Sequence, residues 1–182
     1  MKRVHYTWRD VENFTQEIIR QIHNDGWRPD YVVGITRGGL VPANLISQYL
    51  GVPMETLRVS LRDGSECESN LWMAEDAFGY VPKDEQLLAE FDYSINAKNI
   101  LIVDDINDTG ATLNWIQQDW PSGCLPKHDR WNHIWGNNVR VATLVDNESS
   151  ESNVNINYTA CTINKAFEPQ WIVFPWEQWW MK

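Results

Sequence analysis

Three features that mark large classes of proteins are absent from this sequence. No apolar run approaches the roughly 20 residues that a transmembrane helix requires, and YVVGI and ILIV are only as long as a strand. The opening MKRVHYTWRD lacks the apolar core of a signal peptide. Three cysteines cannot all pair, and their positions lack metal-ligand spacing. We therefore expect reduced thiols and a cytoplasmic location.

Positive charge is also scarce. Fifteen Lys and Arg residues stand against 25 Asp and Glu residues, which gives a net charge of −10. Nucleic-acid binding demands a basic face, so we expect no nucleic-acid partner, and we expect no membrane partner either. A small anionic substrate is still compatible, because backbone amides can create a local positive field.

Tryptophan, by contrast, is abundant. The chain has 11 tryptophans, and four of them fall within residues 171–182. We interpret most of them as core or interface residues rather than stacking surfaces, and we expect a homo-oligomer. The length of 182 residues, with 43% hydrophobic and 22% charged residues, is typical of one globular domain covering residues 1–182.

The hydrophobic pattern alternates between strands and helices. Thr7 and Asp10 form a capping-box pattern, and the helix that follows should end at Gly26. Two segments lack a clear pattern: residues 62–98, interpreted as a flap, and the Trp-rich insertion 121–138, where Pro121 should stop a helix. Further helices are predicted at 40–50 and 111–120, and strands at 31–35, 54–61, 99–103, 139–145, 158–163 and 171–174. This order predicts an α/β fold with a parallel sheet flanked by helices.

The most informative stretch is ILIVDDINDTGAT, residues 100–112. Asp104 and Asp105 should lie at the carboxyl end of a buried strand, where open α/β sheets bind ligands. Gly110 permits a turn whose amides form an anion nest, and Thr109 and Thr112 add hydroxyl donors at a helix start. This turn is predicted to hold a phosphate.

The neighbouring carboxylates must then face a neutral or cationic part of the same ligand. A ribose diol fits, since an ionised carboxylate accepts hydrogen bonds and a diol supplies two donors. Magnesium also fits, because it prefers carboxylates shared with ligand oxygens and water. A ribose 5-phosphate with a metal-bound leaving group satisfies the whole motif, and Asp108 would lie near its reactive face.

The motif resembles the 5-phosphoribosyl 1-diphosphate (PRPP) signature of the type I phosphoribosyltransferases. YVVGITRGGLVPANLISQYLG, residues 31–51, resembles the pyrophosphate-loop segment of their xanthine-guanine branch. The resemblance implies that Arg37, Gly38 and Gly39 bind pyrophosphate, with a non-proline cis peptide at Thr36–Arg37 or its neighbour. It also implies that the turn from Asp108 to Thr112 binds the 5′-phosphate; its residues are Asp108, Thr109, Gly110, Ala111 and Thr112.

Two further segments extend the resemblance. The flap 62–98 falls where the family has a mobile hood, for which Ser60 and Arg62 are candidate residues. WIVFPWE resembles the base pocket within residues 163–182, where Trp171 would stack on the base and the backbone of Ile172 would read its edge. Glu177 matches a family acid near that pocket.

One departure affects the substrate. The 6-oxopurine enzymes have a lysine after the following strand that binds the exocyclic oxygen of the base, whereas this chain has Asp146 or Asn147 there. Asn147 offers a single uncharged donor, and the next lysine is Lys165. Asn107 also replaces a spacer that is usually apolar. The acceptor base therefore stays open at this point.

The resemblance implies transfer of a phosphoribosyl group from PRPP to a nitrogenous base, with purine salvage the favoured role. Asp104 and Asp105 would hold the ribose diol, directly or through Mg²⁺, and Asp108 would act as a general base at the attacking nitrogen. Two alternatives are the same transfer to another acceptor and a non-catalytic regulatory protein that senses PRPP.

Overall fold

A computed structural model of the chain describes residues 1–61, 66–80, 92–177 and 180. Its helices are α1 (Trp8–Asp25), α2 (Leu40–Leu50), α3 (Leu71–Phe78), α5 (Tyr93–Asn96), α6 (Ala111–Gly123) and α7 (Trp131–Ile134). Its strands are β1 (Lys2–His5), β2 (Tyr31–Thr36), β3 (Met54–Ser60), β4 (Glu66–Cys67), β5 (Ile100–Asn107), β6 (Val139–Asn147), β7 (Tyr158–Ile163) and β8 (Gln170–Val173).

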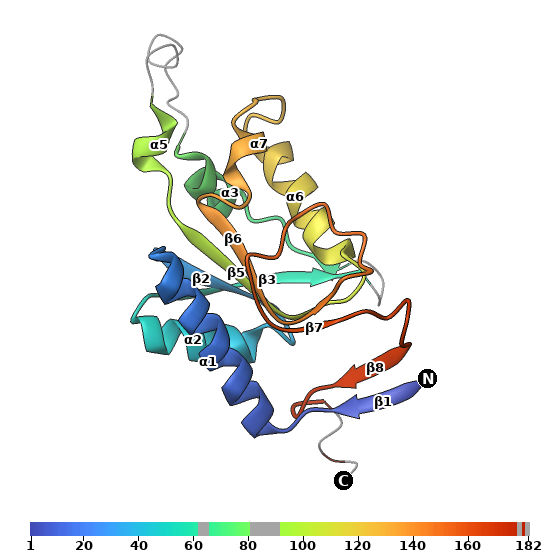
Figure 1. Cartoon of the computed structure of the whole chain (residues 1–182). Coiled ribbons are helices and arrows are strands. Elements are labelled where there is room, and N and C mark those ends of the chain that lie inside the picture. Colours follow the sequence, from blue (N-terminus) through green and yellow to red (C-terminus); the bar gives the residue numbers. More distant parts are fainter. Residues whose placement is uncertain (62–65, 81–91, 178–179, 181–182) are drawn as a thin grey trace.

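The main sheet confirms the predicted α/β class. Its strand order is β4-β3-β2-β5-β6-β7. Five strands are parallel, and only the two-residue β4 at the edge is antiparallel. Helices α1 and α2 cover one face, and α3, α6 and α7 cover the other (Figure 1). Parallel strands end at the same edge of a sheet, so the loops after β2, β5, β6 and β7 gather there.

Strand β5 lies at the centre because its apolar run is buried on both faces. Ile100 and Ile102 pack with α3 and α6, whereas Leu101 and Val103 pack with α1 and α2. The strand continues beyond the predicted end at Val103 and includes both acidic residues. The two acids therefore lie within the ladder that β5 forms with β6.

The first helix begins as the sequence predicts. The Thr7 side chain accepts a hydrogen bond from the Asp10 amide, and the Asp10 side chain accepts one from the Thr7 amide. This reciprocal capping box satisfies amides that a helix start would otherwise leave without partners. Gly26 ends the helix in the left-handed conformation, again as predicted.

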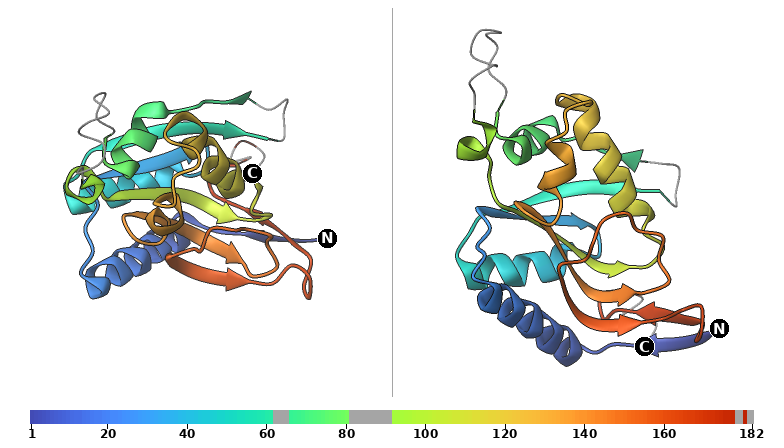
Figure 2. Two further views of the ribbon diagram at one scale, coloured as in Figure 1. Left: turned by 90° about the horizontal axis from the view of Figure 1, so that it is seen from above. Right: turned by 45° about the horizontal axis from the view of Figure 1, so that its top comes forward.

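A separate two-stranded ladder was not predicted. Strand β1 pairs in parallel with β8, with Arg3 opposite Trp171 and His5 opposite Val173. Both views in Figure 2 place it beside the edge toward which the parallel strands point. β1 has only four residues, of which only Val4 is half-buried and the others are exposed. Such a strand has no hydrophobic pattern of its own and is defined by its partner.

The flap segment contains a helix that the sequence did not predict, and the insertion begins differently from the prediction. Within 62–98, α3 packs on the core, with Met73 and Phe78 fully buried; the assignment of this segment as a hood stays a prediction. The rest of that prediction concerns mainly residues 62–65 and 81–91, including Arg62, which lie outside the described residues. Pro121 lies inside the last turn of α6 rather than stopping it, because near a helix end its missing amide removes only one hydrogen bond.

The tryptophans of this region are core residues. Trp120 of α6 and Trp131 of α7 are buried in the same cluster as Phe78, and the Trp120 and Trp135 rings lie 5.6 Å apart between centroids. The insertion 121–138 therefore completes one face of the sheet.

Two further predictions concern the cysteine thiols and membrane-spanning helices. Cys67, Cys124 and Cys161 are all free thiols, as predicted. Within the described ranges, no helix combines the length and apolarity that crossing a membrane requires.

Replacing Trp120 by alanine should lower the free energy of unfolding by about 3–5 kcal/mol, because truncating a buried aromatic leaves a cavity. Trp72 is the matched control: it is 42% exposed, against 1% for Trp120, and Trp72→Ala should cost much less. Urea unfolding measures both variants. Similar losses would contradict the core role of Trp120.

Candidate active site

The carboxylates of β5 lie against the loop that joins β2 to α2. Asp105 is half-buried, and a Cβ atom added to Gly38 would fall 1.9 Å from its Oδ2 atom. A Cβ on Gly39 would fall 2.3 Å from the carbonyl oxygen of Val103. Only glycine lets the loop approach β5 this closely. The Thr36–Arg37 peptide just before these glycines is cis, as the resemblance implied.

Local hydrogen bonds orient the two acids. Oδ1 of Asp104 accepts a hydrogen bond of 2.9 Å from the Asp105 amide, and Oδ1 of Asp105 accepts one of 2.9 Å from the Ile106 amide. Burial, followed by the negative charge of Glu177, raises the pKa of Asp105 to about 6. A ligand that brings hydroxyl donors or a cation to this carboxylate would offset both effects.

The turn 108–112, which was predicted to bind a phosphate, packs against the loop between β6 and β7. Gly110 has a positive φ of 84°, and a Cβ atom there would fall 2.4 Å from the Ser152 amide nitrogen. The carbonyl oxygen of Thr109 accepts a hydrogen bond of 3.1 Å from the Glu151 amide. Asn114 donates to the Glu151 carbonyl oxygen at 2.8 Å. The polar loop between β6 and β7 thus fixes the turn against the start of α6, where the first amides of the helix could bind an anion.

Asp108 begins that turn and forms an ion pair with Lys165. Nζ of Lys165 lies 2.7 Å from Oδ1 of Asp108, and the two side chains are only 17% and 20% exposed. Sequence spacing did not indicate this contact, which joins the β5–α6 turn to the residues after β7.

Asn147 links the same two residues through their backbones. Its side-chain amide donates to the Asp108 carbonyl oxygen at 2.8 Å, and its Oδ1 accepts from the Lys165 amide at 3.0 Å and from the Ser149 hydroxyl at 2.9 Å. Asn147 is buried. Its side chain thus positions Asp108 and Lys165, a role that the sequence did not reveal.

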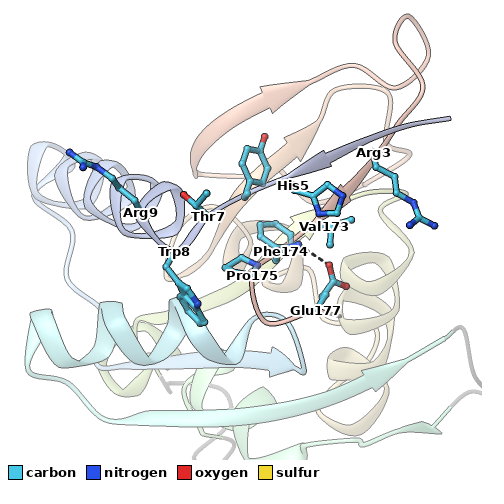
Figure 3. A pocket seen from close by; sticks show the side chains of 10 residues that line it. Arg3, His5, Thr7, Trp8, Arg9, Val173, Phe174, Pro175 and Glu177 are labelled. Carbon is cyan, nitrogen blue, oxygen red and sulfur yellow. Dashed lines mark hydrogen bonds between the residues drawn. The ribbon is translucent and has the colours of Figure 1, made fainter. Parts of the chain in front are cut away.

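The predicted base-pocket residues lie on the β1–β8 ladder. Trp171 is 44% exposed, whereas Ile172 is buried against the α1 face of the core. Glu177 Oε2 accepts a hydrogen bond of 2.9 Å from the Phe174 amide (Figure 3).

A cavity of about 580 Å³ opens beside the ladder. Arg3 and His5 lie near Glu177, and Thr7 and Trp8 line the α1 end (Figure 3). These four residues were missed because only the pairing of β1 with β8 brings them to this edge.

Asp104 and Asp105 are the residues that could hold a metal ion. Among the residues that the structure describes, no group of three or more His, Cys, Asp or Glu side chains forms a metal cluster. Mg²⁺ nevertheless fits an adjacent carboxylate pair, since it is commonly bound by one or two carboxylates together with substrate phosphates and water.

Replacing Asp105 by asparagine should stabilise the protein most at alkaline pH. A carboxyl with a raised pKa binds its proton more tightly in the folded protein than in the unfolded chain, so it opposes folding increasingly as the pH rises from about 4 to above 6. The gain in the free energy of unfolding for Asp105→Asn should therefore be larger at about pH 8 than at about pH 4. Urea titrations at both pH values measure it.

Asp10 provides the control. The hydrogen bonds from the side chain and the amide of Thr7 lower its pKa, so the stability that it contributes is lost as the pH falls. Asp10→Asn should show the opposite trend, a loss that grows with pH. If Asp105→Asn raised the free energy of unfolding equally at both pH values, the raised pKa of the Asp105 carboxyl would be contradicted.

Comparisons with known proteins identify the family of the chain. Residues 6–178 match the family model described as "Phosphoribosyl transferase domain". The chain is 24% identical to a hypoxanthine-guanine phosphoribosyltransferase of Schizosaccharomyces pombe, covering 96% of this chain and 89% of that protein. It is 25% identical to a xanthine-guanine phosphoribosyltransferase of Cereibacter sphaeroides, covering 97% and 87%.

Two solved structures share the fold. The purine phosphoribosyltransferase of Pyrococcus horikoshii superposes with a TM-score of 0.61 at 24% identity, covering 98% of this chain and 96% of that one. The xanthine-guanine-hypoxanthine phosphoribosyltransferase of Helicobacter pylori gives 0.64 at 17% identity, with the same coverage. Because the family model matches residues 6–178, which is nearly the whole chain, this protein belongs to the phosphoribosyl transferase domain family.

Proposed function

We propose that this protein transfers the 5-phosphoribosyl group of PRPP to a purine base in purine salvage, giving a nucleoside 5′-monophosphate and pyrophosphate. The closeness of Gly38 to the Asp105 carboxylate supports this proposal, because a glycine loop that suits pyrophosphate then lies beside an acid that suits a ribose diol. Relatives named for hypoxanthine, guanine and xanthine support the purine assignment.

The order of the binding groups matches the order of groups along PRPP. β2 and β5 are neighbours, so the loop after β2 and the turn after β5 flank the two acids. Arg37 and the amides of Gly38 and Gly39 bind the pyrophosphate at C1. Asp104 and Asp105 hold the ribose hydroxyls at C2 and C3, and the turn 108–112 holds the 5′-phosphate.

The reaction breaks the bond between C1 and the pyrophosphate oxygen as a ring nitrogen of the base attacks C1. Such glycosyl transfers pass through an oxocarbenium-like state, which the negative charge of Asp104 and Asp105 favours. Asp108 accepts the proton that the base loses. Arg37 with the glycine amides stabilises the leaving pyrophosphate. Asp104 and Asp105 would hold Mg²⁺, directly or through the ribose hydroxyls, and the ion would supply positive charge to the phosphate oxygens.

The base lies over the indole of Trp171, and the backbone of Ile172 reads its edge. Asn147 acts at the base site through Asp108 and Lys165, whose backbones it binds. The partial exposure of Trp171 on β8, 44%, supports this placement. We also propose a cytoplasmic location, for which the three free thiols give support, and a homo-oligomeric assembly.

The direct test is release of pyrophosphate from PRPP and Mg²⁺ with a panel of bases. Turnover with at least one purine is the expected result. Turnover only with pyrimidine or other non-purine acceptors would instead support the alternative substrate class. PRPP binding with no turnover on any base would support a sensor protein that has kept the fold.

Replacing Asp108 by asparagine should lower kcat by about 10²–10⁴-fold, the usual contribution of a general base. The KM for PRPP should change little, because the turn amides and Thr109 remain. Steady-state kinetics separates the two effects, and Asp129→Asn, an exposed acid before α7, is the control. Unchanged kcat would exclude the base role, and a urea unfolding curve excludes loss of fold as the cause.

A further inference from the structure

A second cavity, of about 430 Å³, lies against α6, the Trp-rich insertion 121–138 and the loop between β6 and β7. The helices of this region cover one face of the main sheet (Figure 1). Gln117 lines the cavity and lies about 9 Å along the axis of α6 from the turn at its start. Trp135, on another wall, bridges to Val139, the first residue of β6. The cavity therefore extends from the middle of α6 toward the amino edge of the sheet, away from Asp104 and Asp105.

Side-chain carboxamides form the polar part of the wall. Gln117 comes from α6, Asn132 from α7, and Asn153 and Asn155 from the loop between β6 and β7. Each carboxamide offers two N–H donors and an acceptor oxygen. None of the described residues that line the cavity has an ionisable side chain. A charged ligand would lose hydration there without gaining a counter-charge, so the cavity suits an uncharged polar molecule.

Two tryptophans supply the aromatic part of the wall, and both are held by other protein groups. Trp131 is buried, and its Nε1 donates a hydrogen bond of 2.9 Å to the Cys124 carbonyl oxygen. The ring of Trp135 packs on that of Trp120, 5.6 Å away between centroids. Fixed aromatic walls with a few polar groups are typical of small-molecule sites, and the volume of the cavity lies within their usual range.

This combination of groups indicates the chemistry of the ligand. A hydroxyl group both donates and accepts a hydrogen bond, so it pairs with a carboxamide in either orientation. The C–H groups of a saturated ring are apolar and pack well on an indole. An uncharged ring that carries several hydroxyl groups satisfies both parts of the wall, and sugars and the ribose of a nucleoside share this chemistry.

The cavity also shares a wall with the support of the turn 108–112. The Asn153 amide donates to Oδ1 of Asn114 at 2.7 Å, and the Asn114 side chain donates to the Glu151 carbonyl oxygen at 2.8 Å. Asn114 and Gln117 are neighbours on one face of α6. A ligand bound between Gln117 and Asn153 would join the same helix and loop that Asn114 joins. It would thereby hold the loop more firmly against the turn.

We propose that this cavity is a second binding site, for an uncharged ring with several hydroxyl groups, and that its occupation strengthens PRPP binding at the turn 108–112. The site itself is independent of the proposed function, whereas its link to PRPP rests on that function. Because such coupling is reciprocal, PRPP would strengthen the binding of the second ligand by the same factor.

The first test titrates D-ribose, D-glucose and inosine into the full chain and follows binding by ligand-observed NMR. Binding of at least one of them is the expected result. Binding of a free sugar would show that the hydroxyl-bearing ring is sufficient, whereas binding of inosine alone would assign the site to a nucleoside. Binding of none would overturn the proposal.

Variants of the wall locate the bound ligand. Gln117→Leu removes the donors and the acceptor of one carboxamide and should weaken binding about 2–10-fold, the usual effect of losing neutral hydrogen bonds. Gln118→Leu is the matched control, since Gln118 is exposed on the same helix and is not among the residues that line the cavity. It should bind like the wild type.

A second variant guards against a loss of fold. Asn155→Ala alters the loop rather than the helix and should also weaken binding about 2–10-fold, with thermal unfolding curves recorded for all variants. Equal affinity in the wild type, Gln117→Leu and Asn155→Ala would place the ligand elsewhere and overturn the site.

The link to the turn is measured by calorimetry of PRPP with Mg²⁺, with and without the uncharged ligand that binds. The Kd for PRPP should fall at least about twofold in the wild type, and less in Gln117→Leu at the same ligand concentration. An unchanged or higher Kd would overturn the link. If PRPP did not bind at all, the link would fall together with the proposed function, whereas the titrations of the uncharged ligands would still decide the second site.

Discussion

The close contact between Gly38 and the Asp105 carboxylate is the constraint on which the site depends. It exists because β2 and β5 are direct parallel neighbours, so that the loop after one reaches the acidic end of the other. Any side chain at residue 38 would occupy the space of the carboxylate. Gly110 has the same role on the other side of the acids, where the backbone of Ser152 packs so closely against the turn 108–112 that a side chain would clash with it. Gly38 and Gly110 bring backbone amides close to the two acids from opposite sides. Such a site suits a ligand that carries anionic groups as well as hydroxyl groups or a cation.

The electrostatics follow from this arrangement. Burial and Glu177 raise the pKa of Asp105, so its carboxylate carries an unfavourable charge until a diol or a cation reaches it. Positive groups lie nearby despite the net charge of −10: Lys165 pairs with Asp108, and Arg37 follows β2. Lys165 offsets the charge of Asp108, so that the edge carries less net negative charge than its three aspartates alone would give.

The sequence predicted local elements well and tertiary contacts poorly. β5 and the turn 108–112 were predicted because a buried apolar run and a glycine turn are local signals, and α2 has the predicted bounds of Leu40–Leu50. β1 was missed because only its pairing with β8 defines it. α3 was missed because its flanks mix glycine, serine and acids, although its own buried face packs on the core. The pairing of Lys165 with Asp108 joins residues far apart in the chain, and no local pattern encodes it.

Calorimetric titration of PRPP with Mg²⁺ into the wild type and Gly38→Ala would test most directly whether the two loops form one PRPP site. Gly136→Ala is the control for a general loss of stability: an alanine at its φ of 81° is strained, but it lies at the opposite end of β6 and its added Cβ would meet only the Asn157 side chain at 3.8 Å. The account predicts that the wild type and Gly136→Ala bind PRPP, whereas Gly38→Ala binds it at least tenfold more weakly, about 1.4 kcal/mol. Equal affinity in all three proteins would contradict it.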